Sequence, residues 1–287
     1  MFNLIMTTQN IDGEKTKRFF DSLNAMTGDI REKLFLYIIN QDKRPAAGLT
    51  IKYKEIFTDK CSLSKARNLG LAQLPEEPGI IAFPDDDCWY SDSILKFVEE
   101  NINNNDFICT GVFDPYKGIS YGNNRPLKTR TAIDEANALL LPISVGIFYK
   151  YSAVDEIPFF DERFGVGTDW GSGEETDFVL QLLKDGKRGE YNSFDCVYHE
   201  AERDKDFNVS SIYKYALGFA AMAEKSKYVR KQDEAYKQFK KIKARSYMAK
   251  IYYLFVPNKR AVYSARLKGF KRGCAEGREF YRNENAR

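Results

Sequence analysis

The sequence has few of the features that mark a secreted, zinc-binding or membrane-spanning protein. Its five cysteines are scattered and include no CxxC pair, which argues against a disulfide framework or thiolate zinc site and for a reducing compartment. The longest apolar runs are broken by proline or polar residues, so no membrane span is expected. The opening MFNLIMTTQNI is too short, and too polar after Met6, to predict a signal peptide.

Several common binding motifs are also missing. No Walker pattern occurs, and GVGTDW is not a dinucleotide fingerprint, because it lacks the third glycine and does not open a helix directly after a strand. Nothing in the chain resembles a nucleic-acid-binding motif. The chain has a single histidine, His199, and a lone histidine is more often structural than a ligand.

The composition is that of a globular protein with an uneven distribution of charge. The 287 residues are 43% hydrophobic and 30% charged, enough for one large domain or for a domain with an appendage. Residues 201–287 hold 22 Lys/Arg and 9 Asp/Glu, a net charge of +13. Because the whole chain carries +3, residues 1–200 carry −10. An acidic body is therefore followed by a basic tail.

The first 115 residues alternate between predicted strands and predicted helices. Apolar runs predict strands at 2–8, 34–39, 51–57, 79–83 and 106–113. Helical spacing predicts helices near 13–27, over 62–74 with a cap at Ser62 or Ser64, and over 91–102 with a cap at Ser91 or Asp92. This alternation indicates βαβ units and a mainly parallel sheet, in which ligands bind beyond the carboxyl ends of the strands.

Three consecutive aspartates, Asp85, Asp86 and Asp87, follow the apolar run GIIAF and Pro84. Adjacent carboxylates repel one another unless a cation or hydrogen-bond donors offset their charge. Mg²⁺ and Mn²⁺ are held through one or two carboxylates together with substrate phosphates. The triplet is therefore either a metal site at the end of a buried strand or a solvated acidic turn.

A second acidic group, Glu174, Glu175 and Asp177, begins a predicted helix that ends at Gly186. Acidic residues are common in a first helical turn because they favour the helix dipole, so this group needs no ligand. The preceding loop, however, is rich in glycine and contains Trp170. An aromatic platform followed by carboxylates suits a small polar ligand such as a sugar, and a carboxylate there could act as general base.

Seven segments occur in a recognisable order over residues 2–200: Thr7-Thr8-Gln9, Asp42 after the second strand, LSKARNLGL, IIAFPDDDCWYSD, SVGIFYK, PFFDERFGVGTDWGSGEETDF and VYHE. Together they resemble GT-A glycosyltransferases of the large bacterial family 2. The resemblance implies a mixed, mainly parallel α/β sheet flanked by helices. It also implies a catalytic domain at 1–200, with a nucleotide-sugar half (1–115) and an acceptor half (116–200), followed by a basic helical extension at 201–287.

The resemblance implies roles for individual residues on the donor side. The expected contacts to the nucleotide-sugar donor are Thr7, Gln9, Asp42, Arg67, Asn68 and Asp85, the last at the ribose. The expected ligands of Mn²⁺ or Mg²⁺ are Asp86, Asp87 and His199. Many relatives have an aspartate where this chain has Pro84, which leaves open which two of the three aspartates are used.

On the acceptor side, the resemblance implies Glu175 as the base, with Glu174 as the rival and Asp177 in support. Trp170 would form part of the wall for the acceptor or the donor sugar; the alternative is that it packs inside its own loop. The implied reaction is inverting transfer from a nucleotide-diphosphate sugar, with a UDP-sugar expected, to a glycan or lipid-linked saccharide in bacterial surface polysaccharide synthesis. The alternatives are a sugar nucleotidyltransferase and a non-catalytic nucleotide- or glycan-binding module.

The basic tail, 201–287, is a separate feature. It contains no proline from 211 to 245, which predicts one or two helices, and Pro257 marks a break before another basic stretch. Lys and Arg beside Tyr and Phe suit an anionic membrane surface, and the alternative is a solvated helical pair packed through its aromatics. Nucleic-acid binding is disfavoured. We expect a cytoplasmic protein that can sit peripherally on the inner face of the cell membrane.

Overall fold

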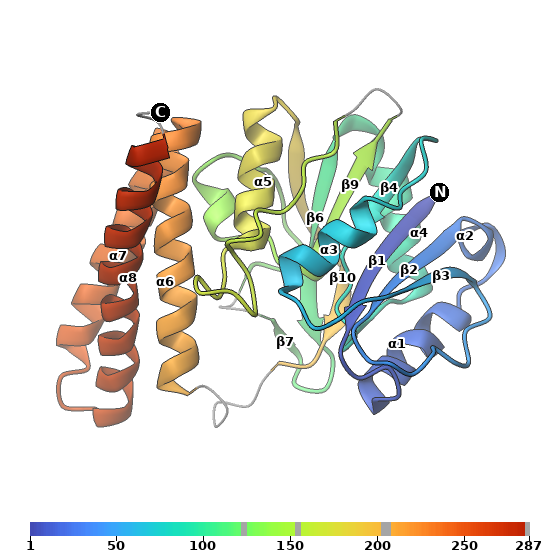
Figure 1. Ribbon diagram of the computed structural model, residues 1–287, viewed down its shortest axis with the longest axis horizontal. Coiled ribbons are helices and arrows are strands. Elements are labelled where there is room, and N and C mark those ends of the chain that lie inside the picture. Colours follow the sequence, from blue (N-terminus) through green and yellow to red (C-terminus); the bar gives the residue numbers. More distant parts are fainter. Residues whose placement is uncertain (122–124, 153–155, 202–207, 285–287) are drawn as a thin grey trace. The chain divides into compact units, whose positions relative to one another are not determined.

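The computed structural model describes residues 1–121, 125–152, 156–201 and 208–284 (Figure 1). The chain divides into two compact units. Unit 1 comprises Met1–Ile133, Leu141–Phe159 and Gly186–Ala201. Unit 2 comprises Asp134–Leu140, Phe160–Asp185 and Glu202–Arg287.

Unit 1 is built on a mixed sheet. Its strands are β1 (Phe2–Thr8), β2 (Leu34–Asn40), β3 (Lys52–Phe57), β4 (Gly79–Ala82), β5 (Cys88–Trp89), β6 (Phe107–Asp114), β7 (Ile119–Ser120), β8 (Arg130–Ala132), β9 (Ile147–Tyr151) and β10 (Gly189–His199). The main path runs β3-β2-β1-β4-β9-β6-β10-β5. Strands β1 to β4 pair in parallel, as do β6 and β10, while β9 is antiparallel to both of its neighbours.

The helices and short turns of unit 1 lie between its strands in the sequence. They are α1 (Glu14–Asn24), α2 (Gly28–Glu32), α3 (Leu63–Leu71), α4 (Asp92–Asn101), and the 3-10 turns η1 (Ile102–Asn104) and η3 (Ser144–Gly146). Ser62 caps α3 by accepting a hydrogen bond from the Lys65 backbone amide at 3.4 Å. The predicted mixed α/β fold with mainly parallel strands is confirmed, and the predicted strands fall within a few residues of those observed.

The sheet is apolar on both faces because helices cover both. Leu4 and Met6 of β1 share a core with residues of α1 and α4, such as Phe19 and Leu95. Ile5 points to the other face, where α3 crosses β1 at Gly70. A Cβ atom at Gly70 would lie 2.3 Å from a methyl carbon of Ile5, so only glycine allows this close approach. This packing fixes the carboxyl ends of β1, β2 and β4 beside one another.

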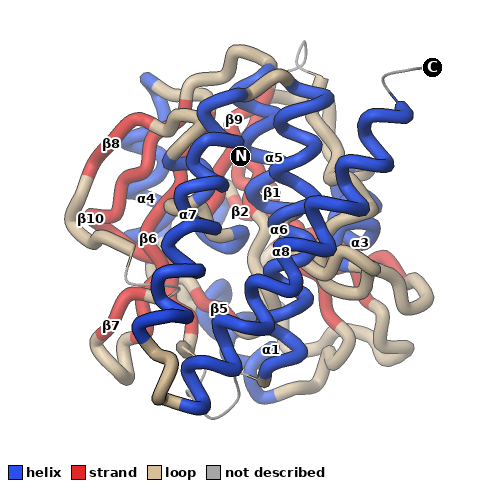
Figure 2. Tube along the Cα trace, turned by 90° about the vertical axis from the view of Figure 1, so that its left-hand side faces the viewer, coloured by secondary structure: helices blue, strands red, loops and turns tan. Residues whose placement is uncertain are grey.

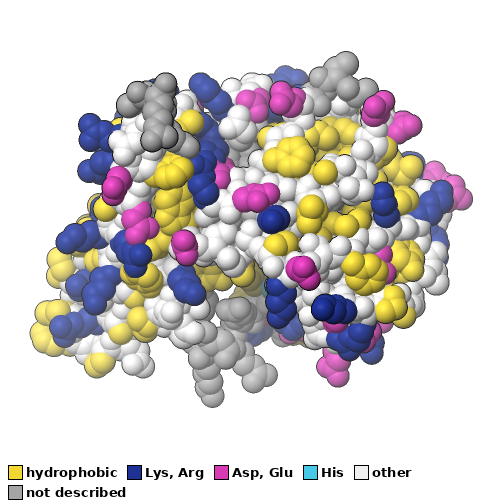
Figure 3. Space-filling model, in the orientation of Figure 1, with side chains coloured by type: hydrophobic (Ala, Val, Ile, Leu, Met, Phe, Trp, Pro, Cys, Tyr) yellow, Lys and Arg dark blue, Asp and Glu magenta, His cyan; other side chains and the backbone are white. Residues whose placement is uncertain are grey.

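Unit 2 is helical (Figure 2). Its elements are the 3-10 turn η2 (Asn137–Leu139), α5 (Glu174–Lys184), α6 (Val209–Lys225), the π-helical turn η4 (Ser226–Arg230), α7 (Asp233–Tyr252) and α8 (Pro257–Glu284). The expected helical extension is confirmed, and Pro257 stands at the first position of α8, where its missing N–H costs nothing. Many Lys and Arg side chains lie on the exposed surface of these helices (Figure 3).

Helices α6 and α8 pack closely because α8 presents glycines to α6. A Cβ atom at Gly273 would lie 2.1 Å from the Leu217 carbonyl oxygen, and one at Gly269 would lie 2.4 Å from the Tyr213 carbonyl oxygen. Within the described residues, no helix is both long enough and apolar enough to cross a membrane.

Candidate metal and nucleotide site

The three aspartates lie at the carboxyl edge of the sheet. Strand β4 ends at Ala82, and Asp85 continues beside β1 through an isolated bridge with Thr7. Strand β5 then pairs antiparallel with β10 in a register that sets Cys88 opposite His199. This pairing brings the only histidine of the chain next to Asp87.

Asp85, Asp87 and His199 form a cluster of potential metal ligands. One ligand atom from each of them lies within 4.8 Å of the others. The closest contact is 3.0 Å, between Asp87 Oδ1 and His199 Nε2. Asp86, which was also expected to bind metal, is not a member of this cluster, and its Oδ2 accepts a hydrogen bond from the Thr8 hydroxyl at 2.5 Å. The structure therefore brings Asp87 and His199 together as expected, with Asp85 as the third member.

The donor set of the cluster fits a divalent cation. His199 Nδ1 lies 2.8 Å from the Glu200 carbonyl oxygen, so this nitrogen carries the proton and donates. Nε2, which faces Asp87, is then the nitrogen available to a metal, in the arrangement common for histidine ligands. The ring also packs against Tyr121 at 4.4 Å between centroids, which fixes its orientation. Two carboxylates and one oriented imidazole can together hold one Mn²⁺ or Mg²⁺ ion.

Cationic side chains surround the aspartates. Arg67, fully buried on α3, donates from Nη2 to Asp85 Oδ1 at 3.0 Å. Lys15 Nζ lies 3.2 Å from Asp87 Oδ2, and Arg18 Nη2 donates to the Asp87 carbonyl oxygen at 3.2 Å. Arg67 thus contacts an aspartate of the expected donor site and holds it in place.

The electrostatic environment differs among the three aspartates. Burial raises the pKa of Asp85, although Arg67 opposes the shift. Burial also raises the pKa of Asp86, to about 6, against the hydrogen bond from Thr8. At Asp87 burial acts in the same direction, but the hydrogen bond and charge of His199 prevail and lower its pKa to about 2. Burial would lower the pKa of His199, yet Asp87 raises it.

The residues expected at the nucleotide lie on neighbouring strand ends. Thr7 and Gln9 are at the end of β1, with Thr7 half-buried and Gln9 exposed. Asp42 follows β2, where it accepts hydrogen bonds from the Ile11 amide at 3.2 Å and from Arg44. The Arg44 hydrogen bond is the main cause of the low pKa of Asp42, about 2. Asn68 is buried on α3.

The second acidic group lies in unit 2, at the start of α5, after Gly173 in a left-handed conformation. Asp177 is buried and forms ion pairs with Lys225 at 2.8 Å and with Arg230 at 2.7 Å. Glu174 is also buried. Glu175 is half-buried, and its carboxylate makes no hydrogen bond or ion pair within the described part of the chain. Of the three side chains, that of Glu175 is the most exposed.

Trp170 is packed within unit 2. Its indole nitrogen donates to Glu276 at 3.1 Å, and its rings contact Phe164, Phe280 and Tyr281. This burial agrees with the alternative of a packed loop residue. Its contact with an acceptor sugar stays a prediction.

No role was predicted for Thr8, although it lies in the segment Thr7-Thr8-Gln9, and none was predicted for Lys15 or Arg18. The available signal was the pair of basic residues at helical spacing in EKTKRFF, directly after the first strand. That signal is weak, because exposed basic residues are usual in a first amphipathic helix. Their contacts with Asp86 and Asp87, more than sixty residues away, appear only in the fold.

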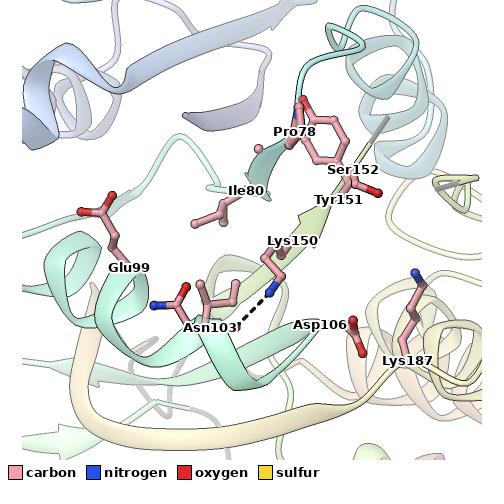
Figure 4. A pocket seen from close by; sticks show the side chains of 11 residues that line it. Pro78, Ile80, Glu99, Asn103, Asp106, Lys150, Tyr151, Ser152 and Lys187 are labelled. Atoms are coloured by element: carbon pink, nitrogen blue, oxygen red, sulfur yellow. Dashed lines mark hydrogen bonds between the residues drawn. The ribbon is translucent and has the colours of Figure 1, made fainter. Parts of the chain in front are cut away.

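A pocket of about 550 Å³ opens elsewhere in unit 1 (Figure 4). It is lined by Gly79 and Ile80 at the start of β4 and by Tyr151 at the end of β9. Lys150, also in its wall, donates to the Ile102 carbonyl oxygen at 3.5 Å. Because Asp85 follows the other end of β4, this pocket lies at the opposite edge of the sheet from the aspartate cluster.

Solved structures that are similar to this chain in fold include a mannosyltransferase and S. aureus TarS. The mannosyltransferase PcManGT from Pyrobaculum calidifontis, in complex with GDP-Man and Mn²⁺, matches 97% of this chain and 87% of its own, with a TM-score of 0.58 and 11% identity. S. aureus TarS 1–349 in complex with UDP-GlcNAc matches 99% of this chain and 92% of its own, with a TM-score of 0.51 and 12% identity.

A longer chain of S. aureus TarS matches 78% of this chain with a TM-score of 0.53 and 16% identity, and this chain spans 41% of it. No protein-family model matches the sequence, and no match is found among curated proteins. Over nearly its full length, the chain has the GT-A glycosyltransferase fold, as the resemblance implied.

Proposed function

We propose that this chain transfers a sugar from a nucleotide-diphosphate sugar to a saccharide hydroxyl, with inversion, and that it requires a divalent cation. The observation that carries the proposal is the cluster of Asp85, Asp87 and His199 at the carboxyl edge of a GT-A sheet. In α/β sheets of this kind, ligands bind beyond the carboxyl ends of the strands. Asp42, at the end of the neighbouring strand β2, adds a polar group for the nucleotide.

Asp85, Asp87 and His199 would hold the cation on the donor diphosphate, and Mn²⁺ suits an imidazole ligand better than Mg²⁺ does. When bound, the cation supplies Lewis-acid stabilisation of the departing diphosphate. Lys15 and Arg18 add positive charge on the same side as Asp87. Arg67 orients Asp85 through its buried guanidinium, and Thr7 and Gln9 contact the nucleotide together with Asp42. A UDP-sugar is the expected donor.

Glu175 is the proposed base. Its side chain would accept the proton of the acceptor hydroxyl as the oxygen attacks the anomeric carbon from the face opposite the diphosphate. Asp177 is a poor candidate because two cations already bind it. Glu174 remains the rival, although it is more deeply buried than Glu175. The proposed acceptor is a glycan or a lipid-linked saccharide.

The donor half of the proposal is tested by thermal unfolding with nucleotides. UDP together with Mn²⁺ should raise the melting temperature of the wild type by several degrees, because a ligand bound only to the folded state stabilises it. Neither UDP nor Mn²⁺ alone should do so to the same extent. Running UDP-GlcNAc and GDP-mannose in parallel identifies the base and the sugar that are preferred.

Asp87→Asn should abolish the shift caused by UDP and Mn²⁺. Asp29→Asn is the matched control, because Asp29 is exposed on α2, before the amino end of β2, and its loss removes the same charge. If both variants respond like the wild type, the cluster does not bind metal and the proposal fails. Binding of the donor without release of UDP in the presence of any acceptor would instead favour a non-catalytic binding module.

A further inference from the structure

The turn between α7 and α8 projects beyond the packed part of unit 2. The last buried residue of α7 is Ser246, and the first buried residue of α8 is Ala265. Every residue from 247 to 264 is described, and none of them is buried. We call residues 247–260 the hairpin tip. It is supported at its base by α6 and α8, but its own side chains have little protein to pack against.

The hairpin tip is nevertheless strongly apolar. It exposes seven large hydrophobic side chains: Tyr247, Met248, Ile251, Tyr252, Leu254, Phe255 and Val256. Ile251 is 72% exposed, Tyr252 80% and Phe255 91%. Isolated exposed hydrophobic residues are ordinary, but a contiguous group of this kind marks a surface that something covers.

The surroundings of the tip are positive. Residues 235–275 contain twelve Lys/Arg and no Asp or Glu. Lys250, Lys259 and Arg260 belong to the tip itself, and Arg245 precedes it on α7. In the space-filling view, hydrophobic and basic side chains alternate at the lower left, where α7 turns into α8 (Figure 3).

We propose that the hairpin tip docks on an anionic lipid bilayer, with its aromatic and aliphatic side chains in the interface and its Lys and Arg side chains on the headgroups. This combination of an apolar stripe with basic flanks is the one that interfacial helices use. Tyrosine is favoured at the headgroup level because its ring is apolar while its hydroxyl group can remain hydrated. The assignment does not depend on the transferase activity.

The charge and the apolar surface of the hairpin tip together favour a bilayer over two other candidate partners, a second copy of this chain and a nucleic acid. Two copies of this chain joined through their tips would bring two acid-free basic segments together, and like charges repel. A nucleic acid would satisfy the Lys and Arg side chains but would leave Met248, Ile251 and Leu254 without an apolar partner. An anionic bilayer satisfies both the charge and the apolar surface.

The tip is braced in the shape that the proposal needs. Tyr253 and Tyr263 stack with their ring centroids 5.8 Å apart and their planes within 2° of parallel. Lys259 Nζ lies 4.6 Å from the Tyr253 ring centroid. These contacts hold the end of α7 against the start of α8. Binding of Ile251 and Phe255 to a bilayer therefore needs no further loss of backbone conformational entropy.

Vesicle flotation tests the proposal on the full chain. The protein should float with vesicles of phosphatidylcholine containing phosphatidylglycerol and should remain unbound with pure phosphatidylcholine. Binding should weaken as salt is raised, because screening shortens the range of the attraction. Equal binding to both vesicle types, or binding to neither at low salt, overturns the proposal.

Two sets of variants separate the apolar and the basic contributions. Phe255→Ser should weaken binding to anionic vesicles about tenfold, since it removes one buried aromatic side chain from the interface. Lys259→Glu with Arg260→Glu should weaken it by roughly fivefold or more for each residue. Phe194→Ser, at an exposed phenylalanine of β10, is the matched control and should leave binding unchanged. An unaffected Phe255→Ser variant overturns the proposal.

Insertion can also be observed directly in a variant that keeps the aromatic ring. Phe255→Trp should shift its fluorescence to shorter wavelength when anionic vesicles are added, whereas Phe194→Trp should not shift. Analytical ultracentrifugation without lipid tests the alternative that two copies of this chain associate through the hairpin tip. Self-association that Phe255→Ser removes, in a protein that ignores vesicles, would assign the tip to an interface between copies and overturn the lipid proposal.

Discussion

Asp87 in unit 1 and Asp177 in unit 2 each contact two basic side chains, yet their surroundings differ. Asp87 contacts His199 and Lys15, its side chain is 27% exposed, and two further aspartates precede it. Asp177 contacts Lys225 and Arg230 and is only 5% exposed. The two aspartates therefore differ in role: Asp87 belongs to a candidate ligand site, whereas Asp177 belongs to a structural ion pair.

The difference indicates where a ligand belongs. In unit 1 burial raises the pKa of Asp85, a member of the cluster, so added positive charge would stabilise its charged form. A divalent cation would supply that charge. Asp177, in contrast, is matched by Lys225 and the buried Arg230 of its own unit, as expected of a structural ion pair. The predictions below probe this contrast, from the largest effect to the smallest.

Removing the charge of Asp87 should have the largest effect on activity. We expect Asp87→Asn to lower the rate of transfer by about a thousandfold or more, because the leaving diphosphate loses its cation. Release of UDP from the preferred donor measures this rate. The unliganded variant should unfold at nearly the wild-type temperature. A variant that keeps more than a tenth of the activity would contradict the metal assignment.

Glu175→Gln should abolish proton removal without disturbing the donor site. We expect transfer to fall by about 10²–10⁴-fold, the usual contribution of a general base. Melting temperature and nucleotide binding should remain those of the wild type, since Glu175 makes no ion pair within the described residues. If transfer persists, Glu174→Gln is the next variant, and loss of transfer there would move the base to Glu174.

Asp177→Ala should damage stability instead of chemistry. Removal of one partner from a buried ion-pair network costs about 3–5 kcal/mol. Arg230 would lose the carboxylate it pairs with, and Lys225 would keep only its ion pair with Asp161 at 2.7 Å. For a chain of this size that corresponds to a melting temperature lower by roughly 10 °C. Glu279→Ala, at an exposed position of α8, is the control. Unchanged stability together with lost transfer would make Asp177 a functional residue and would contradict the structural role assigned to it.

The close packing of α6 on α8 is tested by a smaller change. Gly273→Leu should destabilise the protein by about 2 kcal/mol, because the new side chain starts from a Cβ that overlaps the Leu217 carbonyl oxygen. Ala275→Leu adds the same side chain at an exposed position of the same helix and should be nearly neutral. Chemical denaturation of the two variants provides the measurement. Equal effects would mean that the helices can separate without cost.

Much of the fold can be predicted from the sequence because its buried strands occur as unbroken runs of apolar residues. FNLIMTT and LFLYII are buried on both faces of a sheet, and both form strands close to the expected residues. The position of Asp42 and of the three aspartates at strand ends follows from the same pattern. Ser62 was a readable helix cap because its side chain acts on a backbone amide three residues away.

The details of the site depend on contacts between distant segments. Nothing local distinguishes Asp85 from Asp86, and only the turn after β4 sends one to the cluster and the other to Thr8. His199 reaches Asp87 through a short antiparallel pairing of β5 with β10. Trp170 looked available in a glycine-rich loop, but its partner, Glu276, lies 106 residues further along the chain.

The most direct test of the account is Mn²⁺ binding, followed by electron paramagnetic resonance of the free ion. In the presence of UDP, the wild type should bind one Mn²⁺ per chain. Asp85→Asn, Asp87→Asn and His199→Gln should each weaken this binding at least tenfold, and Asp29→Asn should not. Wild-type binding in all three cluster variants, or no UDP-dependent binding in the wild type, would contradict the account.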